Sequence, residues 1–197
     1  TAAITGRSCF ALWAVTALVP MLAITAAAEG SAFSVFNNVA AAPLSDKKFQ
    51  VGAFFSPWAS GLTKELDGKN MLLGAGAYFT LAEKHSIQLG FRYLQTPGSV
   101  GTDANGNPTN DSFNPTDMTI DLGYGIEIID NLSAGVAGHF VSSKLGDGLG
   151  GSAVAVDLGV QYRLSLNEKM GLDLGFKAAN IGSKLKYGGG EGSALPA

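Results

Sequence analysis

The chain has 197 residues, of which 46% are hydrophobic and only 15% are charged, well below the roughly 25% that is usual in soluble domains. Its 13 basic and 16 acidic residues nearly balance, which excludes the basic surface of a nucleic-acid-binding protein. Its 27 glycines are scattered through apolar stretches, which disfavours a soluble helical protein because glycine destabilises helix interiors.

The N-terminal segment, residues 1–46, precedes the first clear strand pattern. Its apolar run from Phe10 to Ala28 follows Arg7 and ends in three alanines, which is the layout of an export signal. Two other interpretations fit the same residues. One is a plug or first strand packed in or against a barrel, and the other is a membrane-spanning helix that Pro20 interrupts. The sequence leaves these three possibilities open.

From residue 47 onward, apolar and polar residues alternate with a period of two, which predicts strands whose two faces meet different surroundings. In 118–128, for example, large apolar residues occupy one face, whereas polar residues and glycine occupy the other. Most of these strands are long enough for the roughly 9–11 residues that a tilted strand needs to cross a bilayer. The predicted strands are 47–57, 70–81, 86–95, 117–129, 132–143, 153–165 and 170–179.

The connections between these strands alternate in length. The long ones are 58–69, 96–116 and 144–152, and the short ones are 82–85, 130–131 and 167–169. This alternation is typical of an outer-membrane barrel with short periplasmic turns and long outer loops.

We therefore predict an all-β fold for residues 47–197, an antiparallel up-and-down transmembrane β-barrel in the outer membrane of a Gram-negative bacterium, in contact with its lipid. Seven strands are an odd number, whereas bacterial single-chain barrels have even numbers, so we expect an incomplete portion of a larger barrel. The alternative is a small closed barrel in which residues 9–24 supply an eighth strand.

Two stretches resemble a known family. SAFSVFNNVAAAPLSDKKFQVGAFFSPW (31–58) is similar to the entry into the barrel of the PorV/PorQ outer-membrane proteins, a FadL-like group. NIGSKLKY (180–187), followed by LPA (195–197), is similar to a mid-barrel segment of the same group.

The resemblance implies a barrel of about fourteen strands that serves the type IX secretion system of Bacteroidota. Such a shuttle or accessory protein binds the C-terminal signal domain of secreted cargo and meets other secretion-system components. FadL-like barrels that take up hydrophobic small molecules provide an alternative function, and a small structural barrel provides a third.

Candidate functional residues fall into two groups. In the loop 96–116, Phe113 is the expected contact for a protein partner, together with Asn105 and Asn114, because an apolar ring has little reason to lie in a polar loop. The second group consists of charges on the predicted lumen side, which either pair across neighbouring strands or line a path for a substrate. These residues are Arg92, Asp121, Glu127, Asp157, Arg163, Asp173 and Lys177.

The sequence shows no set of residues that points to catalysis, a cofactor or a metal. Asp103 begins a stretch that looks like a calcium loop, but Pro108 stands where the turn glycine belongs and Asn114 replaces the final glutamate. His85 and His139 lie far apart and have no partner at metal-ligand spacing. We therefore predict that the protein is not an enzyme.

Overall fold

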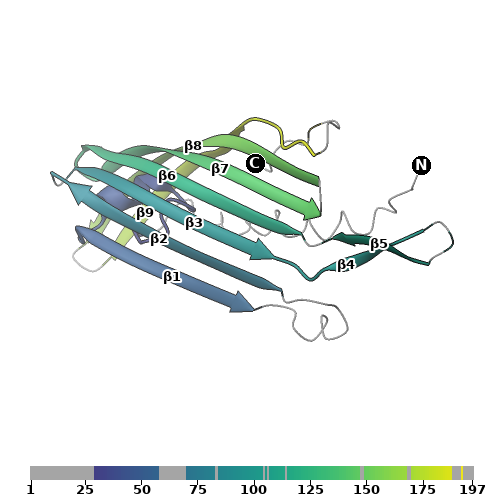
Figure 1. The fold of residues 1–197 in the computed structure, drawn as a ribbon. Helices are drawn as coiled ribbons and strands as arrows, with labels where there is room; N and C mark the ends of the chain where they lie inside the picture. Colours follow the sequence, from purple (N-terminus) through teal and green to yellow (C-terminus); the bar gives the residue numbers. More distant parts are fainter. Residues whose placement is uncertain are drawn as a thin grey trace.

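A computed structural model describes residues 29–57, 70–82, 84–103, 105, 107–113, 115–146, 149–167, 170–187 and 192. Within them, seven strands form one antiparallel sheet whose spatial order follows the chain (Figure 1). This confirms the predicted all-β, antiparallel up-and-down arrangement. The strands are β1 (Phe49–Pro57), β2 (Met71–Leu81), β3 (His85–Gln95), β6 (Thr116–Ile129), β7 (Leu132–Gly146), β8 (Leu149–Asn167) and β9 (Met170–Gly182).

Two of the predicted long loops contain more strand than the sequence suggested. The loop expected at 144–152 is wrong, because β7 and β8 continue to pair as far as Gly146 and Leu149. Pairing satisfies the backbone N–H and C=O groups of these residues, which an irregular loop would leave to water. The loop expected at 96–116 contains a separate hairpin of β4 (Ser99–Thr102) and β5 (Pro108–Phe113).

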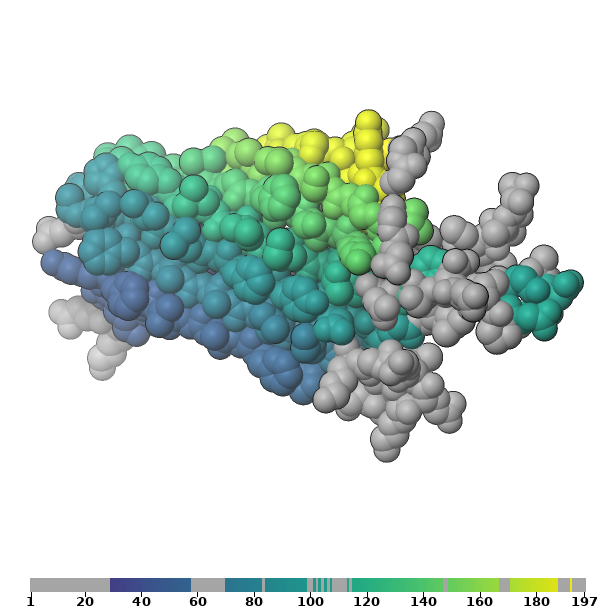
Figure 2. Space-filling model, viewed as in Figure 1, coloured from purple at the N-terminus to yellow at the C-terminus, as the bar shows by residue number. Residues whose placement is uncertain are grey.

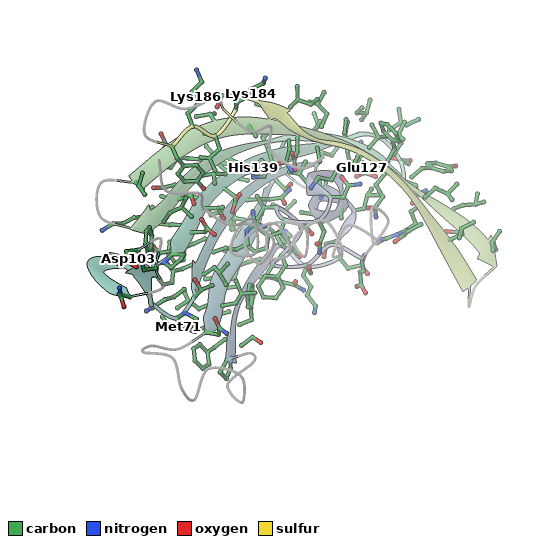
Figure 3. All side chains as sticks on the ribbon, turned by 90° about the vertical axis from the view of Figure 1, so that its right-hand side faces the viewer. Met71, Asp103, Glu127, His139, Lys184 and Lys186 are labelled. Carbon is green, nitrogen blue, oxygen red and sulfur yellow. The ribbon has the colours of Figure 1, made fainter. Side chains whose placement is uncertain are left out.

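The seven-stranded sheet is curved and open. Figure 3 looks along the strands and shows them as an arch over the inner part of the molecule. Strands β1 and β9 are the two edges of this sheet. Because all neighbours are antiparallel, the β1–β2, β3–β6 and β7–β8 connections lie at one end and the other three at the opposite end.

Burial on the two faces of the sheet is the reverse of that in a water-soluble protein. On the convex face, which Figure 2 shows, Leu122 and Leu158 are 59% and 50% exposed. On the concave face, their chain neighbours Asp121 and Asp157 are 0% and 4% exposed. A soluble sheet buries its apolar side chains and presents its polar ones to water.

An N-terminal segment fills part of the concave side. This inner segment (residues 31–45) consists of turns followed by the 3-10 helix η2 (Val39–Leu44), all of whose residues are buried. The helix packs mainly against β6, β7 and β8. The side chain of Asn38 accepts a hydrogen bond from the Ala40 N–H at 3.0 Å and so caps the start of the helix. The interpretations offered above for residues 1–28 lie outside the described residues.

Candidate functional site: the concave face and the inner segment

Glycines on the concave face create the space in which the inner segment lies. At each of them, an added Cβ atom would lie closer than 3.0 Å to an atom of that segment. These glycines come from β1, β2, β3, β6, β7 and β8: Gly52, Gly76, Gly90, Gly123, Gly125, Gly135 and Gly159. Gly138 on the convex face is the opposite case, because nothing lies within 4 Å of the added atom. Part of the high glycine content therefore has a steric reason.

Polar side chains of the strands bind the backbone of the inner segment. Gln88 Nε2 donates to the Val39 carbonyl at 2.6 Å, and the Ser133 hydroxyl donates to the Ala40 carbonyl. Arg163 Nη1 donates to the Leu44 carbonyl at 2.6 Å. These bonds satisfy carbonyl groups that the sheet hides from water. The inner segment is therefore held by specific hydrogen bonds as well as by packing.

Charged side chains from five neighbouring strands form one continuous row of ion pairs across the concave face, here called the charge chain. Its members, in spatial order, are Arg92 (β3), Asp121 (β6), His139 (β7), Asp157 (β8) and Lys177 (β9). The successive nitrogen–oxygen distances are 3.2, 2.5, 2.9 and 2.7 Å. Figure 3 labels His139, the central member, beneath the arch. Cations and carboxylates alternate along this charge chain.

Both ends of the charge chain contact Phe36 of the inner segment. The guanidinium carbon of Arg92 lies 4.6 Å from the centre of the Phe36 ring, a cation–π geometry. Lys177 Nζ donates to the Phe36 carbonyl at 3.1 Å. Phe36 therefore connects the two terminal cations of the chain.

Burial makes the pairing in this charge chain important. Removing a carboxylate from water costs several kcal/mol unless cations and hydrogen-bond donors replace the lost hydration. Asp157 has three such partners, because it faces His139 and Lys177 and also accepts from the Asn180 N–H at 2.6 Å. The charges thus face one another along the chain, an arrangement suited to holding a structure together, and within the described residues only His139 Nε2 of the charge chain makes an ion-pair contact without hydrogen-bond geometry.

The other predicted lumen charges lie elsewhere. Arg163 pairs with Asp173 across β8 and β9 at 3.1 Å, near the turn that joins these two strands. Glu127 accepts a hydrogen bond from the Asn131 N–H at 2.9 Å and so belongs to the β6–β7 turn. The structure does not bring these three residues into the charge chain.

His139 is the member of the charge chain that sequence reasoning missed. It has no partner at metal-ligand spacing in the sequence, yet the register places Asp121 directly opposite it, while Asp157 lies two residues beyond its other partner, Ala155. Its position on the polar face of the predicted strand was the available signal. Among the described residues, no group of three or more His, Cys, Asp or Glu side chains could hold a metal ion.

The comparison with known families decides to which family the chain belongs. A family model described as "Type IX secretion system protein PorV" matches residues 1–197, the whole chain. The chain belongs to the PorV family. The resemblance found in the sequence is thereby confirmed. No curated protein and no solved structure matches the chain significantly.

The β4–β5 hairpin lies in the connection between β3 and β6, at one end of the main sheet. This hairpin extends beyond the main sheet (Figure 1). Asp103 organises its tip, because its carboxylate accepts hydrogen bonds from the N–H groups of Asn105 and Asn107, both at 2.8 Å. The calcium-like stretch is thus a turn stabilised by an aspartate. Phe113 ends β5 and is half-buried, Asn105 is exposed, and Asn114 lies outside the described residues.

The same end of this PorV-family sheet carries a second ordered contact. Tyr187, which follows β9, donates from its hydroxyl to Ser143 Oγ at 2.6 Å. Burial, with a smaller effect of the nearby Asp117 carboxylate, raises the pKa of the Tyr187 phenol. The phenol therefore remains a neutral donor through the physiological range. Among the described residues, no helix is both long and apolar enough to cross a membrane.

Proposed function

We propose that this protein is an outer-membrane shuttle or accessory protein of the type IX secretion system that binds the C-terminal signal domain of secreted cargo. The observation that carries the proposal is the family match over the whole chain. The β4–β5 hairpin supports it, since a two-stranded ribbon that extends from a sheet offers unpaired backbone groups to a partner. We assign Phe113 and Asn105 to the contact with cargo, together with Asn114, which follows Phe113 in the sequence.

The convex face supports the membrane part of the proposal. Apolar side chains from each of the seven strands of the main sheet are exposed on it, including Val51, Phe79, Leu89, Leu122, Val136, Leu158 and Leu174. A contiguous apolar surface of this extent is stable against lipid and unstable in water. Hydrocarbon also requires that backbone groups at the edges of a sheet be paired. We therefore expect the edge strands β1 and β9 to pair with further strands in the membrane.

The polarity of the concave face favours the shuttle over the alternative of a channel for apolar solutes. Its buried side chains include Gln88, Asp121, His139, Asp157 and Gln161. Such a surface, occupied by the inner segment, offers an apolar molecule few favourable contacts among the described residues.

Removal of the hairpin tests the cargo-binding role. The Thr96 N–H and hydroxyl both contact the Pro115 carbonyl, at 3.1 and 3.3 Å, so the chain enters and leaves the hairpin at one paired position. Residues 97–114 can therefore be replaced by a short Gly-Ser turn without changing the pairing of β3 with β6. We expect the variant to fold and to lose capture of a purified cargo C-terminal signal domain.

The control lengthens the β6–β7 turn, at the opposite end of the sheet, by inserting a Gly-Ser pair between Asp130 and Asn131. This control should capture cargo as the parent protein does. If the hairpin deletion captured cargo undiminished, the hairpin would have no part in recognition. If even the parent protein failed to capture cargo at micromolar concentration, the shuttle role itself would be wrong.

A further inference from the structure

His139 lies between two carboxylates of neighbouring strands. Its two ring nitrogens face carboxylate oxygens of Asp121 at 2.5 Å and of Asp157 at 2.9 Å. The Nδ1 contact with Asp121 is a hydrogen bond, whereas the Nε2 contact with Asp157 is an ion-pair distance without hydrogen-bond geometry. Two carboxylates on opposite sides of the ring favour its doubly protonated form, because the positive charge is attracted to both. A neutral imidazole would turn a lone pair toward one of the two carboxylates.

The proton on His139 is connected to the inner segment through both halves of the charge chain. On one side Asp121 orients Arg92, whose guanidinium lies over the Phe36 ring. On the other side Asp157 orients Lys177, which donates to the Phe36 carbonyl. Loss of the proton therefore disturbs both contacts to the same residue.

Few other charged groups lie near His139, so the effect of its proton can be separated from the titration of other groups. The charged groups around it are Arg92 on β3, Asp121 on β6, Asp157 on β8 and Lys177 on β9. The inner segment, 31–45, contains no titratable side chain. Within this cluster, histidine is the residue type whose ordinary pKa, about 6.5, lies nearest neutrality.

We propose that the charge chain is a proton-dependent latch that holds the inner segment against the concave face. The protonated His139 ring joins the two carboxylates, and the terminal cations hold Phe36. The latched state binds the proton more tightly than the released state, so linkage favours the latch at low pH and weakens it as the pH rises. This property would control the position of the inner segment, and it does not depend on the cargo-binding role proposed above.

The test measures how readily a buried position of the inner segment reacts with a water-soluble maleimide. Ala41 is 2% exposed, and the native Cys9 is the only cysteine. An Ala41→Cys substitution in a Cys9→Ser background therefore provides a single reporter. The full chain in detergent micelles is labelled across a pH series, and the rate is divided by that of the same protein carrying His139→Gln. The intrinsic pH dependence of the thiol cancels in this ratio.

We expect the parent to react severalfold more slowly than the His139→Gln variant at low pH, because the variant lacks the cationic ring between the two carboxylates. The ratio should approach one as the pH rises. His85→Gln is the matched control. The His85 ring contacts the Tyr124 hydroxyl at 2.6 Å and takes no part in the charge chain, so this variant should follow the parent at every pH. A ratio that stays constant with pH, or an equal effect of His85→Gln, would overturn the proposal.

A second variant keeps the proposal testable if the His139→Gln protein fails to fold. Lys177→Gln retains His139 and removes the tie to the Phe36 carbonyl. We expect it to be labelled severalfold faster than the parent at low pH, with the heat-modifiable migration of a folded β-sheet protein unchanged. Labelling at the parental rate in this folded variant would show that the charge chain does not hold the inner segment.

Discussion

The two faces of the same strands follow different rules. On the convex face, Leu158 and its apolar neighbours are exposed, and nothing about them requires one particular partner. On the concave face, Asp157, the residue next to Leu158 in the chain, contacts His139, Lys177 and the Asn180 N–H. The convex face thus requires only that its side chains be apolar, whereas the concave face requires particular side chains that contact particular partners. Substitutions on the two faces should differ accordingly.

The largest effect is expected from Asp157→Ala. This change leaves the buried Lys177 and His139 without their shared carboxylate, and breaking a buried ion pair from one side typically costs about 3–5 kcal/mol. The measurement is the free energy of unfolding by urea in lipid vesicles. Asp130→Ala is the control, since Asp130 forms an exposed pair with Lys84 at 3.9 Å and should change the free energy by about 0–1 kcal/mol. Equal losses in the two variants would contradict the role given to the charge chain.

The next effect concerns the convex face. Leu158→Arg, in the middle of β8, should reduce the free energy of unfolding in vesicles by about 2–4 kcal/mol if this face meets hydrocarbon. Leu166→Arg, near the end of the same strand, should cost only about 0–1 kcal/mol because a charge there reaches the interface. If both substitutions were neutral, the convex face would not be the lipid-facing one.

The smallest effect compares glycines on the two faces. Gly159→Val on the concave face would drive its side chain into the Asn38 side chain, and such overpacking typically costs about 1–3 kcal/mol. Gly138→Val on the convex face enters open space and should leave the free energy of unfolding unchanged or slightly raised, because valine favours strands. The same unfolding assay compares them, and a loss in the Gly138 variant as large as in the Gly159 variant would remove the distinction between the faces.

The period-two pattern by itself predicted the seven strands of the main sheet and the division of their residues between two faces, whereas it missed the β4–β5 hairpin. Its reading of β1 to β3, for example, agrees with the structure within two residues at each end. The reason is physical, since side chains of a strand alternate and each face selects for its own surroundings. The same pattern placed Arg92, Asp121, Asp157 and Lys177 on the polar face. It could not extend β7 and β8 through 144–152, because glycine-rich residues carry little alternating signal.

Tertiary structure alone decided which residues meet. Asp121, His139 and Asp157 are 18 residues apart in each step, and only the register of β6, β7 and β8 brings them together. Periodicity assigns a face to a residue and carries no information on its neighbour across the sheet, which depends on the turns and on the fit of whole strands. The inner segment is a second case. Its own sequence has no strand or long helix pattern, and its place depends on glycines and polar side chains contributed by distant strands.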